Sequence, residues 1–465
     1  MSTRVDGPKG HGQESPTIES RDELARYLEE GSKPESEWHI GTEHEKFGFN
    51  VSDNTPVPYE GERGIGALLE AHHNCFGWDA IRENGKIIAL SCSDCPIGGS
   101  ITLEPGGQLE LSGAPLKTIH ETEAELRQHL SQIGSVGKQL GIGFLGIGFS
   151  PKRSLDQTPL VPKDRYRIMM QYMPTRGTNG LNMMFRTATV QVNMDFSDEA
   201  DMVRKLRVAL ALQPVATALF ASSPFKEGTL NGFQSYRAQM WQDTDPDRTG
   251  GLPFAFEEGM GFERYVDYAL DVPMYFVYRD GGYIDVAGSS FRDFLAGKLE
   301  ALPGERPTME DWADHLTTLF PEVRLKKFLE MRGADAGPLG LLLGLPALWA
   351  GLLYDKTALD NAASLIENWT QSERDEMRLA VPMTGLATQF RGGTVQDLAR
   401  EILTLAEGGL RRRAQFNEQG QDETRMLTPL LEIAETGRTE ADRLIAAYQG
   451  PWDGDINRLF ETEAL

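Results

Sequence analysis

Cysteine is scarce in this chain of 465 residues, which contains Cys75, Cys92 and Cys95. Three cysteines in a chain of this length supply no disulfide framework. Cys92 and Cys95 have the two-residue spacing of zinc and redox motifs, but no second pair exists, so a chance spacing or a local turn is the preferred interpretation. The count excludes a small disulfide-rich fold and favours a chain with a large apolar core.

Basic residues are also in deficit, with 46 Lys and Arg against 69 Asp and Glu and a formal net charge of -23. This balance argues against a nucleic-acid backbone or an anionic membrane as the main partner. Local basic pockets for a small anion stay compatible with it.

A long uninterrupted apolar run is absent as well. The most apolar segment, residues 337–354, is short and contains Pro338 and Pro346, which favours a bent, buried core helix over a membrane helix. The first 15 residues are polar and have no apolar centre, so they resemble neither a signal peptide nor an anchor. We expect residues 1–16 to be a disordered tail of a cytoplasmic protein.

No Gly-rich loop ending in Lys-Ser or Lys-Thr occurs, so a Walker nucleotide site is excluded. Gly141, Gly143 and Gly146 have the spacing of a dinucleotide-binding motif, but a predicted helix over 120–140 precedes them and Ser150 with Pro151 follows. The motif requires the opposite order, a strand and then a helix. We therefore expect a glycine-rich strand here and reject a Rossmann domain.

Carboxylates, by contrast, recur at informative positions, first in the segment 41–49. Alternation along a strand puts Glu43 and Glu45 on one face, continued by Phe47 and Phe49. Two like charges on a buried face need a cation or a cationic ligand between them. A solvated edge strand explains the pair equally well when it is taken alone.

A second carboxylate pair lies in the segment 100–112. Two alternating runs surround Pro105-Gly106-Gly107, which predicts a β-hairpin. Glu104 and Glu110 fall on its polar face, together with Thr102, Gln108 and Ser112.

The clearest alternating strand covers residues 186–195. Val190, Val192 and Met194 face one way, whereas Gln191 and Asn193 face the other. Such a strand belongs to an antiparallel sheet with a core side and a polar side. Because the polar side has Thr, Gln and Asn but no Lys or Glu, we prefer a ligand-facing surface to plain solvent.

Charged residues gather again in two later regions. Arg237 and Arg248 are spaced to hold carboxylates or phosphoryl groups, although surface ion pairs would also explain them. Residues 309–330 are predicted to be helical in two parts divided at Pro321. Glu330, Arg332 and Asp335 then leave the pattern, which indicates the rim of a site, although a solvated helix face is the ordinary interpretation.

The acidic patches lie on separate predicted elements: Glu43 with Glu45, Glu104 with Glu110, and Glu330. Hard divalent cations such as magnesium take oxygen ligands and share carboxylates with substrate phosphates. The pattern therefore predicts phosphoryl chemistry on a metal-nucleotide complex. A non-catalytic metal-binding or scaffold protein is the rival from another class, and a two-carboxylate glycosidase would leave the Arg residues unexplained.

With these residues in place, the chain resembles glutamate-cysteine ligases of the branch shared by plants and some proteobacteria. The resemblance covers almost everything after residue 17 and is carried by the segments 40–49, 103–115, 141–149, 183–196, 209–224, 243–253, 265–276, 315–335, 408–413 and 439–452. It implies an α+β fold with a curved, mainly antiparallel sheet flanked by helices, as in glutamine synthetase and guanidino kinases. We expect one catalytic domain over 17–465, in which 359–465 is mostly helical.

The resemblance also implies the reaction, an ADP-forming ligation of the L-glutamate γ-carboxyl to the L-cysteine amine through γ-glutamyl phosphate. This is the first step of glutathione biosynthesis. The implied partners are L-glutamate, L-cysteine and ATP with Mg²⁺, without nucleic acid or membrane, in a monomer or homodimer. Another carboxylate-amine ligase with a different acceptor is the alternative.

Site residues follow from the same resemblance. The expected metal ligands are Glu43, Glu45, Glu104, Glu110 and Glu330. Arg237, Arg248 and Arg332 are the expected catalytic residues, and Arg186, Tyr236, Arg237, Trp241 and Arg248 the expected substrate contacts. Nucleotide or metal contacts are expected from Lys326, Arg332, Gln191 and Asn193. Plant members carry redox cysteines in the later part of the sequence, whereas none follows Cys95 here, so plant-type disulfide control is not expected.

Overall fold

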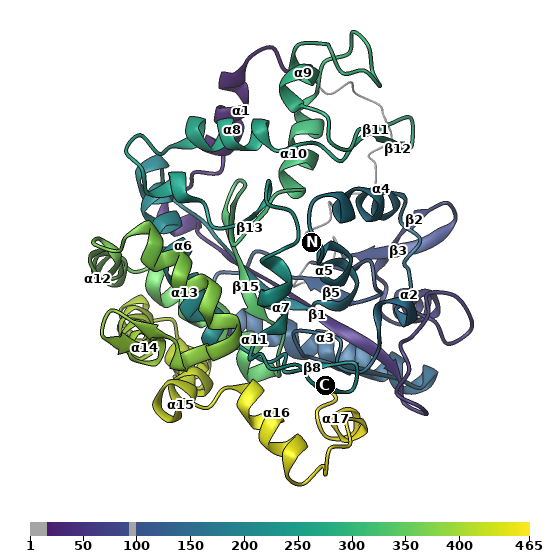
Figure 1. Ribbon diagram of the computed structural model, residues 1–465, viewed down its shortest axis with the longest axis vertical. Coiled ribbons are helices and arrows are strands. Elements are labelled where there is room, and N and C mark those ends of the chain that lie inside the picture. The colour runs from purple at the N-terminus through teal and green to yellow at the C-terminus, as the bar shows by residue number, and fades with distance from the viewer. Residues whose placement is uncertain (1–15, 93–98) are drawn as a thin grey trace.

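A large antiparallel β-sheet organises the computed structural model, which describes residues 16–92 and 99–465. Within these residues the sheet has nine strands in the order β14-β15-β7-β1-β5-β4-β3-β2, with β6 also paired to β1 (Figure 1). Every pairing in it is antiparallel. The strands are β1 (Ile40–Asn50), β2 (Asp79–Glu83), β3 (Lys86–Ser91), β4 (Ser100–Leu103), β5 (Leu109–Ser112), β6 (Ile142–Leu145), β7 (Thr189–Met194), β14 (Val323–Leu325) and β15 (Leu329–Asp335).

Helices surround the sheet and make up the C-terminal part of the chain. They are α1 (Arg21–Glu29), α2 (Ile65–Phe76), α3 (Ile119–Leu140), α4 (Asp164–Tyr172), α5 (Gly180–Arg186), α6 (Glu199–Leu219), α7 (Tyr236–Trp241), α8 (Phe262–Asp271), α9 (Phe291–Leu295), α10 (Met309–Thr317), α11 (Leu339–Leu353), α12 (Lys356–Ile366), α13 (Gln371–Thr384), α14 (Val395–Arg413), α15 (Thr428–Thr436), α16 (Glu440–Gln449) and α17 (Asn457–Thr462). After residue 359 the elements are helices, apart from the short β16 (Gln389–Phe390) and β17 (Gly393–Thr394).

Four further short strands pair in twos, and a parallel pair joins the loop after α7 to the loop after α10. The antiparallel pairs are β8 (Phe225–Lys226) with β9 (Thr229–Leu230), and β11 (Phe276–Arg279) with β12 (Gly282–Asp285). The parallel pair is β10 (Thr249–Gly250) with β13 (Phe320–Pro321).

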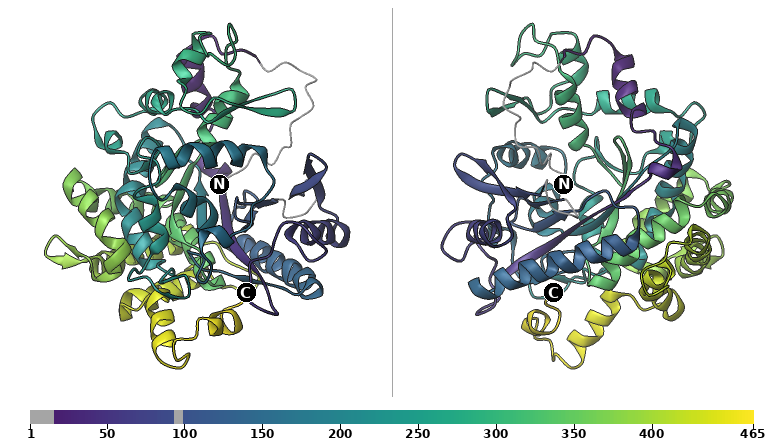
Figure 2. Two further views of the ribbon diagram at one scale, coloured as in Figure 1. Left: turned by 45° about the vertical axis from the view of Figure 1, so that its right-hand side comes forward. Right: turned by 180° about the vertical axis from the view of Figure 1, so that it is seen from behind.

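The two faces of β7 have the division that its sequence predicts. Val190, Val192 and Met194 are completely buried in the main apolar core. α6 packs on β15 and β14, and α11 packs on β7 and β1, so these helices cover the apolar face of the sheet. Figure 2 shows α3 lying along β1 when the molecule is seen from behind. The opposite face of the central strands is therefore the one that carries the polar side chains.

The prediction of a helix after Pro321 is wrong. Residues 323–325 and 329–335 form β14 and β15, which pair with each other, and β15 adds to β7. The segment alternates like a strand, because Val323 and Leu325 are buried in the core while Arg324 and Lys326 point to the polar side, where both interact with Glu330. The mixture of charges in this segment concealed the alternation. Glu330, Arg332 and Asp335 therefore lie in a strand of the sheet, whereas the sequence placed them at the rim of a site.

Helix α11 is the apolar segment around Pro346, and it is buried as predicted, with Leu341 to Leu353 all inside the core. Among the described residues no single helix is long and apolar enough to cross a membrane, although α11 and α12 pass that test together as a pair bent by 88°.

Two sequence predictions concern residues that are wholly or partly outside the description. The expected N-terminal tail falls almost entirely on residues 1–15, and the Cys92 to Cys95 spacing falls partly on residues 93–98. Cys75 is exposed and has a free thiol, whereas Cys92 is disulfide-bonded, so the expectation that the three cysteines form no disulfide framework does not exclude a single disulfide.

Candidate active site

Glu43 and Glu45 lie side by side on the polar face of β1, as predicted. His44 and Lys46, which alternate with these glutamates, point to the opposite face of β1. There the His44 and His129 rings meet edge to face, and Lys46 Nζ lies 3.0 Å from His129 Nε2 of α3. Glu43 is opposite Gln191 of β7, and Glu45 is opposite Glu110 of β5. The solvated-edge interpretation is excluded, because β1 is paired on both sides and both carboxylates are buried.

The hairpin of β4 and β5 brings the second carboxylate pair to the same face. Glu110 is buried and accepts a hydrogen bond of 2.6 Å from Thr102 Oγ1, its partner across the hairpin. Glu104 is also buried and follows the last residue of β4. Glu104 and Glu110 both raise the pKa of Glu45 by charge repulsion. Four carboxylates therefore share one electrostatic environment on three neighbouring strands.

Burial and mutual repulsion make it costly to ionise these groups together. Desolvation, followed by the charges of Glu330 and Glu110, raises the pKa of Glu43 to about 7. Desolvation, with the repulsion described above, raises the pKa of Glu45 to about 8. A bound cation would remove this penalty by favouring the ionised forms.

The carboxylate oxygens of this face suit a hard cation as ligands, although they do not converge on one position in the structure. Glu43 accepts a hydrogen bond of 2.9 Å from Asn193 through Oε1, and its buried Oε2 has no hydrogen-bond partner in the described structure. The neighbouring donors are all carboxylate oxygens, which magnesium prefers. Among the described residues, however, no three His, Cys, Asp or Glu side chains are grouped so that they could already hold a metal ion.

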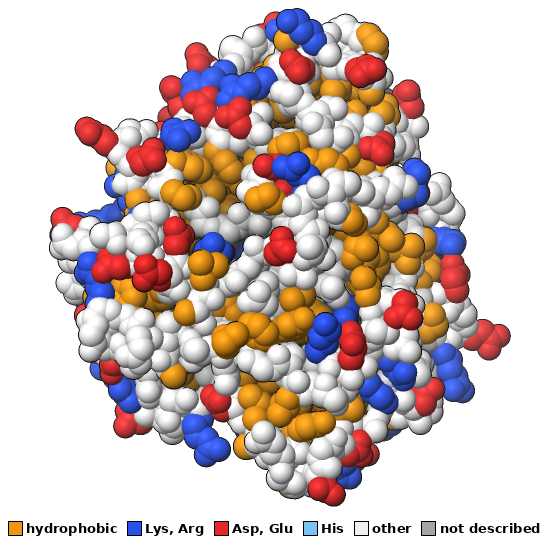
Figure 3. Space-filling view, in the orientation of Figure 1, with side chains coloured by type: hydrophobic (Ala, Val, Ile, Leu, Met, Phe, Trp, Pro, Cys, Tyr) orange, Lys and Arg blue, Asp and Glu red, His pale blue; other side chains and the backbone are white. Residues whose placement is uncertain are grey.

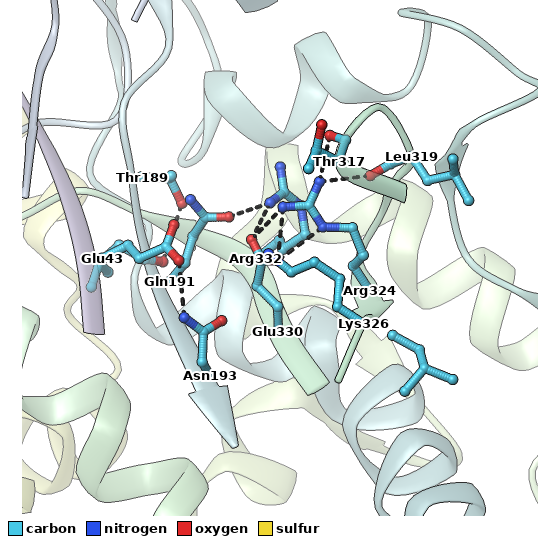
Figure 4. A network of polar contacts seen from close by, with 12 residues as sticks. Glu43, Thr189, Gln191, Asn193, Thr317, Leu319, Arg324, Lys326, Glu330 and Arg332 are labelled. Carbon is cyan, nitrogen blue, oxygen red and sulfur yellow. Dashed lines mark hydrogen bonds and ion pairs between the residues drawn. The ribbon is translucent and has the colours of Figure 1, made fainter. Parts of the chain in front are cut away.

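A buried network of cations surrounds Glu330 on β15 (Figure 4). Arg324 grips both carboxylate oxygens, through Nε at 2.9 Å and a terminal nitrogen at 2.8 Å. Lys326 Nζ lies 3.1 Å from the same carboxylate, and Arg332 donates to it as well as to Gln191. These three cations hold the pKa of Glu330 well below its usual value, in spite of its burial.

This network changes the position of Glu330 among the predicted metal ligands. Both of its oxygens already accept hydrogen bonds from guanidinium groups, so a metal ion would have to displace them. The structure therefore favours the four carboxylates of β1 and the β4–β5 hairpin over Glu330 as metal ligands. Lys326 and Arg332 are both close enough to Glu43 to interact with it electrostatically: the charge of Lys326 lowers the pKa of Glu43, and the charge of Glu43 raises that of Arg332.

Arg237, Trp241 and Arg332 line one pocket with an empty volume of about 550 Å³. Arg237 and Trp241 come from α7, and Arg332 comes from β15. The guanidinium of Arg237 is nearly buried and donates a hydrogen bond of 2.8 Å to the carbonyl oxygen of Arg332. The structure thus brings together three of the predicted substrate or nucleotide contacts.

Arg248, another predicted contact, is taken up by structural interactions. It is completely buried, donates to Asp245 at 2.7 Å and to the Pro273 carbonyl at 2.7 Å, and stacks 3.8 Å from the centre of the Tyr275 ring. It does not line the pocket of Arg237. These contacts favour a structural role.

Arg186 and Tyr236 also lie outside that pocket. Arg186 is buried, pairs with Glu227 at 3.2 Å and stacks on the Phe149 ring. Tyr236 packs edge to face against the same ring. Both side chains therefore contact Phe149, Arg186 from the end of α5 and Tyr236 from the start of α7.

Asp335 anchors the start of α7 from within the sheet. Its buried carboxylate accepts hydrogen bonds from Ser223 Oγ at 2.6 Å and from Ser235 Oγ at 2.7 Å. Ser235 Oγ accepts in turn from the Ala238 amide, and Ser223 Oγ accepts from the Arg237 amide. Asp335 therefore fixes the helix that carries Arg237 and Trp241, which the sequence did not reveal.

Comparison with known proteins agrees with this arrangement. The family model described as glutamate-cysteine ligase family 2 matches residues 39–462. The chain belongs to this family. The resemblance stated from the sequence is thereby confirmed.

Relatives in the glutamate-cysteine ligase family are similar along nearly the whole chain. Glutamate-cysteine ligase B, chloroplastic, of Oryza sativa subsp. japonica is 53% identical over 442 residues, covering 95% of this chain and 86% of the relative. The chloroplastic glutamate-cysteine ligase of Arabidopsis thaliana is also 53% identical, covering 95% and 82%.

The fold is similar to that of a solved protein with a distant sequence. The crystal structure of glutamate-cysteine ligase from Francisella tularensis, in complex with AMP, matches with a TM-score of 0.55 at 13% identity. It covers 91% of this chain and 88% of that chain. The predicted α+β class, a mainly antiparallel sheet flanked by helices, is therefore confirmed for this family member.

Two charged residues in the Arg237 pocket were missed by sequence reasoning. Glu322 precedes β14, and Arg378 belongs to α13, about 55 positions later in the chain. Arg378 looks like any exposed residue on an amphipathic helix when it is seen in sequence. Only the packing of α13 against α7 brings it to the site, so no local pattern could have identified it.

Proposed function

We propose that this chain joins the γ-carboxyl of L-glutamate to the amino group of L-cysteine with hydrolysis of ATP to ADP and phosphate. The observation that carries the proposal is 53% identity to plant glutamate-cysteine ligases over 95% of the chain. Similarity of that extent includes every strand of the polar sheet face. The product is γ-glutamylcysteine, the first intermediate of glutathione biosynthesis.

The proposed cofactors are ATP and magnesium. Glu43, Glu45, Glu104 and Glu110 would hold the metal, since all four are buried carboxylates on one face. When bound, magnesium neutralises the phosphates and the charge that develops during phosphoryl transfer. The AMP complex of the solved F. tularensis ligase supports a nucleotide on this fold.

The side chains of this protein would then orient the substrates and stabilise charge. Arg237 and Arg332 would bind the glutamate carboxylate that becomes the acyl phosphate, because their guanidinium groups adjoin the acidic strands. The γ-carboxylate oxygen attacks the terminal phosphorus of ATP, ADP leaves, and the amine then displaces phosphate. Lys326, Gln191 and Asn193 lie next to Glu330 or Glu43 and would assist in phosphate or metal binding.

Organisation and location are proposed more coarsely. A single domain over residues 17–465 is supported by the main apolar core, which includes residues from Ile18 to Ala434, although two further apolar clusters lie beside it among the described residues. Monomer or homodimer, and small molecules as the partners, remain our expectation from the sequence. A cytoplasmic location also remains a prediction, and the rice and Arabidopsis relatives are named chloroplastic.

An acceptor screen tests this function against its alternative. Phosphate release should require ATP, L-glutamate and L-cysteine together, and replacing L-cysteine by L-serine, glycine or ammonia should lower the rate by at least roughly tenfold. Release that needs L-glutamate but is indifferent to L-cysteine would identify another carboxylate-amine ligase. A scaffold protein would give no turnover with any amine.

A further inference from the structure

A second charged pair lines the pocket of Arg237 and Arg332. It consists of Glu322, which precedes β14, and Arg378 of α13. The pocket adjoins the carboxylates of the sheet, since Arg237 acts electrostatically on Glu45 and Arg332 on Glu43. Trp241, Phe320 and Pro321 supply apolar surface to it. The pocket thus combines three guanidinium groups and one carboxylate with an apolar wall.

Glu322 and Arg378 face each other without closing a hydrogen bond. The distance between Arg378 Nη1 and Glu322 Oε1 is 3.8 Å, longer than a charge-assisted hydrogen bond. Their side chains are 23% and 24% exposed, so a ligand that enters the pocket can reach them. The buried Nε of Arg378 has no hydrogen-bond partner in the described part of the chain, and neither has the buried Nε of Arg237. Arg378 and Arg237 therefore retain capacity to bind charged groups in the pocket.

An open carboxylate-guanidinium pair is complementary to the head group of an α-amino acid. A carboxylate accepts hydrogen bonds from an α-ammonium, and a guanidinium donates to an α-carboxylate in a bidentate manner. A zwitterion that bridges Glu322 and Arg378 from the pocket side would add several short hydrogen bonds to this one long contact. Helix α13 is itself positioned by Gln242, whose side-chain amide donates to the carbonyl of Arg378 at 3.3 Å.

We propose that Glu322 and Arg378 bind the α-ammonium and α-carboxylate of L-glutamate, with its side chain directed toward Arg237 and Arg332. This assignment rests on the proposed function and names the amino-acid subsite of the same site. It gives the C-terminal helical part of the chain a direct role in substrate binding, through α13.

The charge pattern selects glutamate over cysteine as the occupant. The pocket is lined by the guanidinium groups of Arg237, Arg332 and Arg378, and L-glutamate has two carboxylates separated by methylene groups. L-cysteine has one carboxylate and would bring no second carboxylate to Arg237 and Arg332. The γ-carboxyl would also lie on the side of Glu43 and Glu45, where phosphoryl transfer is proposed.

The test uses the full-length protein and compares L-glutamate with glutarate, which lacks the ammonium group. By isothermal titration without ATP, the wild type should prefer L-glutamate, and Glu322→Gln should weaken L-glutamate binding roughly 10- to 100-fold while leaving glutarate binding unchanged. Arg378→Gln should weaken both ligands by a similar factor. In steady-state assays, the KM for L-glutamate should rise in both variants, and the KM for L-cysteine should stay within about twofold.

Glu257→Gln is the matched control, because Glu257 and Arg264 form a pair with the same 3.8 Å separation on the exposed surface. Glu257→Gln should leave the KM values for L-glutamate, L-cysteine and ATP unchanged. The inference is overturned if Glu322→Gln binds L-glutamate like the wild type, or if the KM for L-cysteine rises in its place. Either result would leave the proposed function standing, because the wild type could still form γ-glutamylcysteine. The proposed function fails only if the wild type forms no γ-glutamylcysteine.

Discussion

Replacing Glu43 with glutamine should lower the rate of ATP-dependent ligation by roughly 100- to 1,000-fold at saturating substrates. Glu43 lies at the centre of the polar sheet face, and its Oε2 has no partner among the described residues. Glutamine keeps the volume and can still accept from Asn193, so the fold should survive while one anionic metal ligand is lost. Magnesium should then give a smaller rise in melting temperature than it gives to the wild type.

The same substitution has a pH signature in the metal-free protein. The pKa of Glu43 is raised from its usual 4.5 to about 7, so the folded state binds a proton more tightly than the unfolded state. The associated stability is fully present below pH 4.5 and is lost as the pH rises through about 7. Denaturant melts at pH 5 and pH 8.5 should show this loss in the wild type and a smaller loss in Glu43→Gln.

Glu62→Gln makes the same chemical change at an exposed position and serves as control. It should alter neither the rate nor the pH dependence of stability. Full ligation activity in Glu43→Gln would contradict the role of this carboxylate, whatever the melts show.

Replacing Arg324 with methionine should destabilise the fold by about 3–5 kcal/mol. Every guanidinium nitrogen of Arg324 is engaged, two with Glu330 and the third with the carbonyls of Thr317 and Leu319. Methionine fills part of the volume but leaves these buried acceptors without their donor, and the cost of an unpaired buried acceptor exceeds the net value of the bond. The free energy of unfolding in urea measures the effect.

Arg82→Met is the matched comparison, because Arg82 grips Glu70 in the same bidentate manner, at 2.6 and 2.9 Å. That pair is about 40% exposed on both sides, so its loss should cost at most about 1 kcal/mol. If the two variants lose equal stability, burial does not give the Glu330 network the importance that we assign to it.

The parts of the fold that depend on local alternation could be predicted from sequence. The hairpin of β4 and β5 and the two faces of β1 and β7 follow from side chains that alternate with period two. The face carrying Glu43, Glu45, Glu104 and Glu110 was recognised for this reason. β14 and β15 were missed because Arg324, Lys326 and Glu330 looked like the charged face of a helix, whereas these residues pair with one another inside the structure.

The contacts between distant segments could not be predicted in this way. Arg248 looks like a carboxylate-binding arginine in sequence, yet in the structure its guanidinium donates to Asp245 and stacks on Tyr275. Glu322 and Arg378 have no distinguishing neighbours in sequence, and they meet only because α13 packs against α7. A charged residue therefore reveals its chemical type in sequence, but its partner only in the folded chain. Figure 3 illustrates the difficulty, since acidic and basic side chains are interspersed over the face that it shows.

Oxygen-18 transfer from substrate to phosphate is the most direct test of the account. L-glutamate labelled with oxygen-18 in its γ-carboxyl group is incubated with ATP, magnesium, L-cysteine and the purified protein. If ligation proceeds through γ-glutamyl phosphate, γ-glutamylcysteine should form and each released phosphate should carry one labelled oxygen in its mass spectrum. Unlabelled phosphate, or phosphate release without γ-glutamylcysteine, would contradict the proposed reaction.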